Sequence, residues 1–225
     1  MSWRGRNSRA MAYRKTARVR EHLADRRSRI LDAARHLVAE GGFDDAPMTA
    51  IAARAGVATG TVYRYFPSKV ALLGEVVRLT SQRELEVVAA IAMADGTATE
   101  RLRQAIAAFA GRALRRRRLA YALVAEPVGP EIDATRISYR RALGRVFETI
   151  VEQGIRAGEF PPQKVPASAA CLVGACIEGL VGPLSPETIA AAEDGTALIE
   201  AIQAFCLRAV GGAGDPGQLS RKPWA

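Results

Sequence analysis

The segment from Pro47 to Lys69, PMTAIAARAGVATGTVYRYFPSK, constrains the fold of this chain most. Small apolar residues recur at helical spacing from about Thr49 to Ala55. Gly56 follows directly, and a glycine ends a helix there because it adopts a positive φ without a Cβ clash. Thr59 can then cap a second short helix through its hydroxyl. This layout predicts a helix-turn-helix, whose second helix lies in the DNA major groove.

The second short helix, from about Gly60 to Phe66, has one apolar side and one polar side. Val62 and Phe66 are expected to face inward, and Pro67 ends the helix. The outward side chains are of the kinds that contact phosphates and base edges. The spacing alone leaves open an ordinary surface hairpin of two helices. The candidate DNA-binding residues are Thr49, Thr59, Gly60, Thr61, Tyr63, Arg64, Tyr65 and Lys69.

The sequence from Ala55 to Lys69, AGVATGTVYRYFPSK, resembles the signature of TetR/AcrR-type transcriptional regulators. The stretch ILDAARHLVAEGGF, from Ile30 to Phe43, is similar to the first helix of that family and its glycine stop. The resemblance covers about the first 80 residues. The chain departs from it at Pro47, where the family more often has a Ser or Thr cap, which affects one phosphate contact. The resemblance implies a DNA-binding regulator with an inducer pocket and a dimer interface in its later helices.

Positive charge is concentrated at the same end of the chain. Of the 225 residues, 1–70 contain 14 Lys and Arg against 6 Asp and Glu, whereas 71–225 contain 18 against 17. A module that binds a polyanion needs such an asymmetry. Arginines that could lie near phosphates crowd the start of the first long helix: Arg18, Arg20, Arg26, Arg27 and Arg29.

The rest of the chain predicts helices only, since no segment alternates with period two. Helices are expected at about 18–40, 68–93, 99–114, 119–124, 131–157, 165–184 and 196–210. The predicted fold is all-α, with an N-terminal three-helix helix-turn-helix DNA-binding domain and a C-terminal helical ligand-binding and dimerisation domain. The predicted parts are a flexible basic arm (1–16), the DNA-binding domain (17–67), the helical domain (68–211) and a flexible tail (212–225). The arm either contacts DNA or is a solvated tail.

Four further features bear on location and chemistry. Cys171, Cys176 and Cys206 have no metal-ligand spacing, so we expect no metal site. We also expect no cofactor, and unpaired cysteines fit a reducing cytoplasm. No apolar run approaches the roughly 18–20 residues of a membrane span, so no membrane partner is expected. The run Arg115–Arg118 is interpreted as a solvated helix end. No paired acids, phosphate loop or nucleophile set indicates an enzyme.

The resemblance implies that an inducer pocket lies among the helices between residues 68 and 184, and that the last two helices form a four-helix bundle with a second copy. Candidate ligand-binding residues are Phe109, Tyr121, Tyr139, Phe147, Cys171 and Glu178, the last expected to be buried. Candidate dimer residues are Gly174, Ile177, Val181, Ile202 and Phe205. The predicted function is a repressor released from a near-palindromic DNA operator by a small, mainly apolar effector. A helical interaction protein without sequence-specific DNA binding and a small-molecule enzyme are the alternatives.

Overall fold

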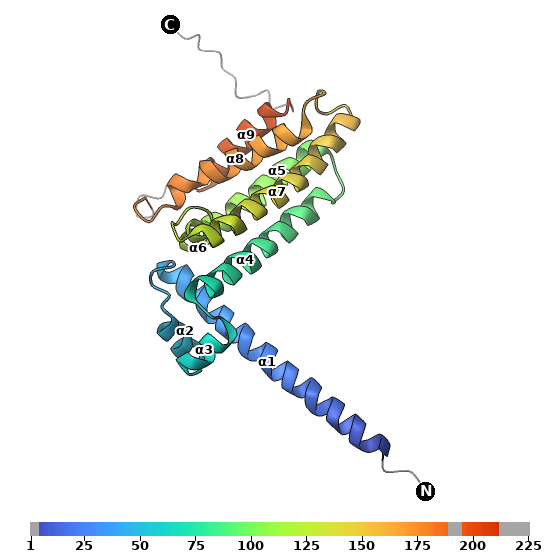
Figure 1. The fold of residues 1–225 in the computed structure, drawn as a ribbon. Coiled ribbons are helices and arrows are strands. Elements are labelled where there is room, and N and C mark those ends of the chain that lie inside the picture. Colours follow the sequence, from blue (N-terminus) through green and yellow to red (C-terminus); the bar gives the residue numbers. More distant parts are fainter. Residues whose placement is uncertain (1–4, 189–194, 212–225) are drawn as a thin grey trace. The chain divides into compact units, whose positions relative to one another are not determined.

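The computed structural model describes residues 5–188 and 195–211, with side chains from His22 onward, and every regular element in that part is an α-helix (Figure 1). The helices are α1 (Gly5–Gly41), α2 (Met48–Ala55), α3 (Thr59–Tyr65), α4 (Lys69–Ala92), α5 (Ala98–Arg115), α6 (Arg117–Val124), α7 (Pro130–Arg156), α8 (Val165–Leu184) and α9 (Gly195–Ala209). The predicted all-α fold is confirmed. The chain divides into two compact units, residues 1–76 and 77–225, with the boundary inside α4.

The first unit contains α1, α2, α3 and the start of α4. Its core comes from the apolar positions that the periodicity predicts, and Ile30, Val38, Ile51 and Val62 are fully buried. Helix α1 begins at Gly5 rather than near residue 18, so residues 5–16 of the predicted arm are helical in the structure. Residues 1–4 of that arm and the predicted tail at 212–225 lie outside the described residues.

The starts of α3 and α4 differ in how they are capped. Ser68 caps α4 as predicted, because the backbone N–H of Ala71 donates to its Oγ at 3.0 Å. The prediction that Thr59 caps α3 is wrong: Ala58 is the N-cap, with no side-chain hydrogen bond. The chain enters the helix one residue earlier, since the backbone N–H of Thr61 donates to the Ala58 carbonyl at 2.8 Å.

The second unit consists of the remainder of α4 and helices α5–α9. Helices α7 and α8 pack against each other, as do α5 and α9. The largest fully buried side chains of this core include Leu102, Ile106, Leu143, Phe147, Ile150, Leu172 and Ile177. Burying such a set of apolar side chains is the main favourable term in folding.

Two polar devices fix helix ends in this unit. Thr97 forms a capping box with Glu100 at the start of α5. Glu159 accepts hydrogen bonds from the backbone N–H groups of Ala98 (2.8 Å) and Thr99 (2.9 Å) at the same helix end. Burial by itself raises the pKa of Glu159, but these hydrogen bonds outweigh it and leave the pKa lowered. The carboxylate therefore stays charged where it offsets the unpaired N–H groups of the helix start.

Helix α8 is long and apolar enough to cross a membrane by length and composition. The prediction that no apolar run approaches that length is therefore wrong, because Glu178 is the single charge in its 20 residues. Core helices of soluble proteins have the same composition, so one such helix is weak evidence for a membrane span. Only 33% of its apolar stretch is buried within this chain. Much of one side of α8 is thus left uncovered by the part of the chain that the structure describes.

Two glycines inside α7 provide a test of this packing. A Cβ added at Gly154 would lie 2.2 Å from Cδ2 of the buried Phe160, whereas a Cβ added at Gly144 meets nothing within 4 Å. Overpacking costs about 1–3 kcal/mol, and alanine is favoured over glycine in a helix by about 0.5–1 kcal/mol. We expect Gly154→Ala to lower the free energy of unfolding and Gly144→Ala to raise it, measured by urea unfolding followed by circular dichroism. Equal effects of the two substitutions would contradict the close α7–Phe160 packing.

Candidate nucleic-acid interface and ligand cavity

The turn between α2 and α3 is held by backbone hydrogen bonds. Gly56 adopts φ 65°, and its N–H donates to the Ala53 carbonyl at 3.2 Å. The N–H of Val57 donates to the Ala52 carbonyl at 3.0 Å. These two bonds form a Schellman motif, which satisfies carbonyls that a helix end leaves unpaired. The turn therefore fixes the direction in which the chain enters α3.

Two arginines of α1 hold the other helices of this unit. Arg29 donates from Nη2 to the Ala55 carbonyl at 2.6 Å, at the end of α2. Arg27 pairs from Nη2 with Oε1 of Glu75 in α4 at 2.6 Å, and its guanidinium lies 5.2 Å from the centre of the Phe66 ring. Arg27 and Arg29 thus make contacts within the unit, and the expectation that this arginine face lies near phosphates stays a prediction.

The remaining α1 arginines of that predicted face differ from one another. Arg26 is exposed. The side chains of Arg18 and Arg20 lie outside the described residues.

A second link between α1 and α2 is the ion pair of Arg54 with Glu40, in which Nη2 and Oε1 are 2.9 Å apart. The last turn of α2 is thus fastened to α1 by two arginine contacts.

Helix α3 presents most of its polar side outward as predicted, but the hydroxyl of Tyr65, which was also expected to face outward, is buried. Tyr63 is 51% exposed and Arg64 is exposed, while Val62 and Phe66 are buried. Within the described residues no side chain pairs with Arg64 or Lys69. Among the other candidates, Thr49 and Gly60 are exposed, and Thr59, Thr61, Tyr65 and Lys69 are half-buried.

Tyr65 differs from the other candidates on α3. Its hydroxyl is buried and has no hydrogen-bond partner among the residues that the structure describes. A buried hydroxyl without a partner costs free energy, and native structures contain few of them. The phenol therefore has a free donor at the end of the helix that carries the other candidates.

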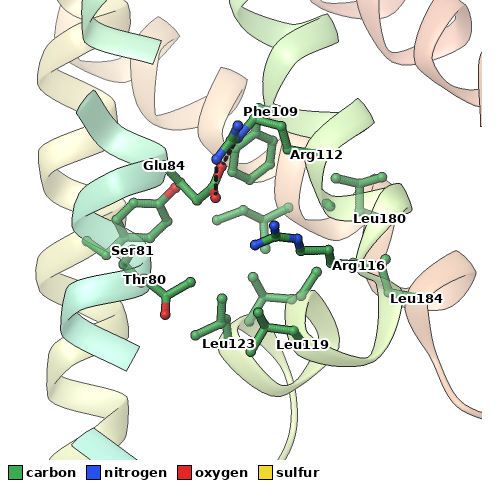
Figure 2. Close-up of a pocket in the computed structure, with 15 residues that line it drawn as sticks. Thr80, Ser81, Glu84, Phe109, Arg112, Arg116, Leu119, Leu123, Leu180 and Leu184 are labelled. Carbon is green, nitrogen blue, oxygen red and sulfur yellow. Dashed lines mark hydrogen bonds and ion pairs between the residues drawn. The ribbon is translucent and has the colours of Figure 1, made fainter. Parts of the chain in front are cut away.

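The second unit contains a partly open cavity of about 60 Å³, lined by α4–α8 (Figure 2). Most of its walls are apolar, supplied by Phe109, Leu119, Leu123, Leu180 and Leu184 among others. Its polar lining consists of Thr80, Ser81 and Glu84 from α4, Arg112 and Arg116 at the α5 end, and Tyr139 from α7. An apolar pocket with a few convergent polar groups is the usual form of a small-molecule site.

An ion pair closes one side of this cavity. Arg112 contacts Glu84 twice, with Nε–Oε2 at 2.5 Å and Nη2–Oε1 at 2.9 Å (Figure 2). The hydrogen bond to Glu84 raises the pKa of Arg112. Burial, together with the nearby charge of Glu84 and the thiol of Cys176, raises the pKa of Tyr139 well above its ordinary value. Tyr139 therefore remains a protonated phenol that can donate a hydrogen bond to a ligand.

The structure brings only two of the predicted ligand-binding residues to the cavity, Phe109 and Tyr139. Phe147 is fully buried in the core, and Cys171 is exposed on α8. Tyr121 is half-buried, with its ring centre 5.9 Å from the guanidinium of Arg118. Glu178, expected to be buried, has a 69% exposed side chain and lies 3.9 Å from Arg140. It lines a second, open groove between α7 and α8.

The structure buries some of the predicted dimer residues and leaves others accessible. Ile177 and Ile202 are buried within their own chain, where Ile202 packs close to Gly179 of α8. Gly174 and Val181 are half-buried, and Phe205 is 55% exposed. Of the large apolar candidates, Phe205 is therefore the one left available to another molecule.

Sequence reasoning missed the polar lining of the cavity: Thr80, Ser81, Glu84, Arg112 and Arg116. Glu84 and Arg112 are 28 residues apart on different helices, and periodicity gives no signal for such a pair. The run Arg115–Arg118 was a visible signal. Its interpretation as a solvated helix end fits Arg115 and Arg116, which are exposed, but Arg116 also lines the cavity, and Arg117 and Arg118 are half-buried.

Both units match models of one protein family. Residues 30–76 match bacterial regulatory proteins of the tetR family, and residues 95–192 match the tetracyclin repressor-like C-terminal domain. The chain belongs to the TetR family. The transcriptional repressor KstR from Mycolicibacterium smegmatis is 45% identical over 78 residues, which cover 35% of this chain and 38% of that protein. KstR from Rhodococcus jostii is 59% identical over 49 residues, 22% of this chain and 23% of that protein. The matched part of the chain spans less than half the length of these relatives.

Solved structures of TetR-type regulators share the fold over most of their length. A TetR/AcrR-family regulator from Thermobifida fusca has a TM-score of 0.66 and 26% identity, covering 81% of this chain and 97% of that chain. The fatty-acid regulator FadR from Bacillus subtilis, solved with stearoyl-CoA, has a TM-score of 0.70 and 23% identity, covering 83% of this chain and 99% of that chain. The likeness to FadR concerns the fold alone. The resemblance noted in the sequence is confirmed.

The buried hydroxyl of Tyr65 leads to a stability prediction. Tyr65→Phe removes a polar atom that has no partner in the described part of the chain, so we expect the free energy of unfolding to stay unchanged or to rise by up to about 1 kcal/mol. Tyr63→Phe is the matched control, since Tyr63 is 51% exposed and should give no change. Urea unfolding of both variants checks this. A marked loss of stability confined to Tyr65→Phe would mean that the hydroxyl is hydrogen-bonded.

Proposed function

We propose that the protein is a ligand-responsive, DNA-binding transcriptional repressor. The observation that carries this is Arg64, an exposed guanidinium on the outward side of α3 with no ion pair in the described part of the chain. The turn at Gly56 determines where α3 begins, so Arg64 is presented from a fixed helix. A free guanidinium on the second helix of a helix-turn-helix can bind O6 and N7 of guanine together.

The other candidates divide by the part of DNA that they would contact. Tyr63, Thr59, Gly60 and Thr61 lie on α3 beside Arg64 and would approach bases or the adjacent backbone. Thr49 and Lys69 lie in the first turns of α2 and α4. Backbone N–H groups at such helix starts favour phosphate binding. Phosphate contacts then set the position of the protein on DNA, and α3 supplies sequence preference.

We infer a homodimer formed through α8 and α9. One reading helix covers few base pairs, so specificity needs two copies about one helical turn (roughly 34–36 Å) apart on a near-palindromic operator. Support comes from the incomplete burial of α8 and from Phe205, which is 55% exposed on α9. A second copy that covers these surfaces would remove apolar area from water. Gly174 and Val181 would lie in the same interface.

The effector would bind in the cavity of the second unit and act through α4. Thr80, Ser81 and Glu84 line the cavity, and the same uninterrupted helix begins at Lys69. About 16 Å of helix separates Lys69 from Thr80, given a rise of about 1.5 Å per residue. A ligand that displaces the cavity wall would move α4 and change the separation of the two reading helices. The structure of FadR with stearoyl-CoA is consistent with an effector site in a chain of this fold.

Repression and a cytoplasmic location are inferred from relatives. KstR is named as a helix-turn-helix-type transcriptional repressor. Regulators of this family act on DNA and are not enzymes. We therefore infer that an effector relieves repression rather than undergoing a reaction.

DNA binding is tested by a pair of substitutions on an operator found by selecting and sequencing bound genomic fragments. Arg64→Ala should cost about 1–3 kcal/mol of operator affinity and relax the preference at one base position. Lys69→Ala should weaken all sequences alike and lower the salt dependence of binding. Fluorescence anisotropy at fixed salt measures both. If Arg64→Ala left affinity and base preference unchanged, the assignment of α3 would be wrong.

The dimer is tested at Phe205. Phe205→Glu should give a monomer by light scattering at micromolar concentration, because it places a charge in an apolar interface. Met93→Glu is the matched control: Met93 is 72% exposed and lies outside α8 and α9, so this variant should remain dimeric. A dimeric Phe205→Glu variant would contradict the proposed interface.

A further inference from the structure

Arg116 is an exposed cation at the open side of the cavity lining, and no described side chain neutralises it. Its side chain extends into the cavity beside the Glu84–Arg112 pair (Figure 2). From this we propose that the effector is an apolar monocarboxylate, whose headgroup pairs with Arg116 and whose body occupies the leucine-lined cavity. The inference rests on the proposed function, since it names the chemical class of the ligand of that site.

The neighbouring arginines show why Arg116 is distinctive. Glu84 neutralises Arg112, and Glu126 contacts Arg118 twice, at 2.8 and 3.0 Å. Arg117 donates from Nη1 to the Pro183 carbonyl at 3.2 Å. In the described part of the chain, Arg116 takes part in no ion pair and in no side-chain hydrogen bond. It is the member of this arginine cluster that both lines the cavity and remains available to a ligand.

The charges of the cavity wall favour an anion over a cation or a neutral ligand. The lining contains one carboxylate, Glu84, and two guanidinium groups, Arg112 and Arg116. Both oxygens of Glu84 are bonded to Arg112, so the carboxylate offers little to a cationic ligand. A carboxylate matches the planar donors of Arg116, and hydrogen bonds between ionised groups are stronger than those between neutral groups. The net positive charge of the lining and the planar donors of Arg116 thus both favour an anionic ligand.

The rest of the cavity lining favours a ligand whose body, apart from its headgroup, is apolar. Leu119, Leu123, Leu180 and Leu184 form most of the wall near Arg116 (Figure 2). The cavity has a volume of about 60 Å³ and is partly open. An apolar ligand seated in it would lie against Thr80, Ser81 and Glu84 of α4. Since α4 is part of the wall, a ligand that displaces this wall would bind and move α4 in the same event.

The test uses the full-length protein and probes that differ only in their headgroup. Octanoate, octanol and octylamine are titrated by isothermal calorimetry, each below its micelle concentration, and phenylacetate and its alcohol provide an aromatic pair. Wild-type protein should bind octanoate about tenfold or more tightly than octanol, as expected for one charge-assisted hydrogen-bonded pair. Arg116→Gln should abolish this preference while retaining octanol binding. Arg115→Gln, an exposed neighbour outside the cavity lining, should keep it.

Several results would overturn the proposal: equal affinity of wild-type protein for octanoate and octanol, a preference for octylamine, or no binding of any carboxylate probe. A carboxylate preference that survives Arg116→Gln would also overturn it. Operator affinity of Arg116→Gln without ligand is measured alongside and should equal that of wild type, which shows that the variant is folded. If operator binding is intact and carboxylates fail to bind, this inference falls and the DNA-binding proposal stands. Loss of operator binding by the wild-type protein would instead refute the proposed function.

Discussion

One uninterrupted helix, α4, supplies residues to both units of the chain. Its first turn carries Lys69 and the Ser68 cap, and its middle carries Thr80, Ser81 and Glu84 in the cavity wall. Two contacts hold it at these places: Arg27 with Glu75 in the first unit, and Arg112 with Glu84 in the second. Backbone hydrogen bonds run the length of such a helix, and we propose that a displacement at the cavity is passed along it. This continuity is the physical basis on which we connect an effector site to DNA binding.

Local sequence signals predicted the helices and the helix-turn-helix well. Gly56, Pro67 and Ser68 act through backbone conformation and capping within a few residues, so their effects can be read from their neighbours in the chain. Apolar periodicity likewise located α7 and α8 to within about one residue. The capping role assigned to Thr59 failed because Ala58, with no capping side chain, begins the helix one residue earlier.

The candidate sites were predicted less well because they depend on pairs of residues far apart in the chain. Charge alone indicated that Arg27 and Arg29 lie near phosphates, but it gave no sign of their acceptors on α4 and α2. Of the aromatic residues predicted to line the cavity, Tyr139 does so, whereas Phe147 lies in the core. The sequence pattern does not separate the two cases, because both positions are apolar and helical. Composition gives the number of charges, whereas pairing decides which of them are left for a partner.

The most direct test of the connection between the two units is a linkage measurement. A ligand found by thermal-shift screening, and shown to occupy the cavity because Arg116→Gln or a wall substitution weakens it, is titrated with and without operator DNA. The α4 mechanism predicts that the ligand weakens operator binding by about 5–150-fold and that the operator weakens ligand binding by the same factor. A ligand that fills the cavity and leaves operator affinity unchanged would contradict the mechanism.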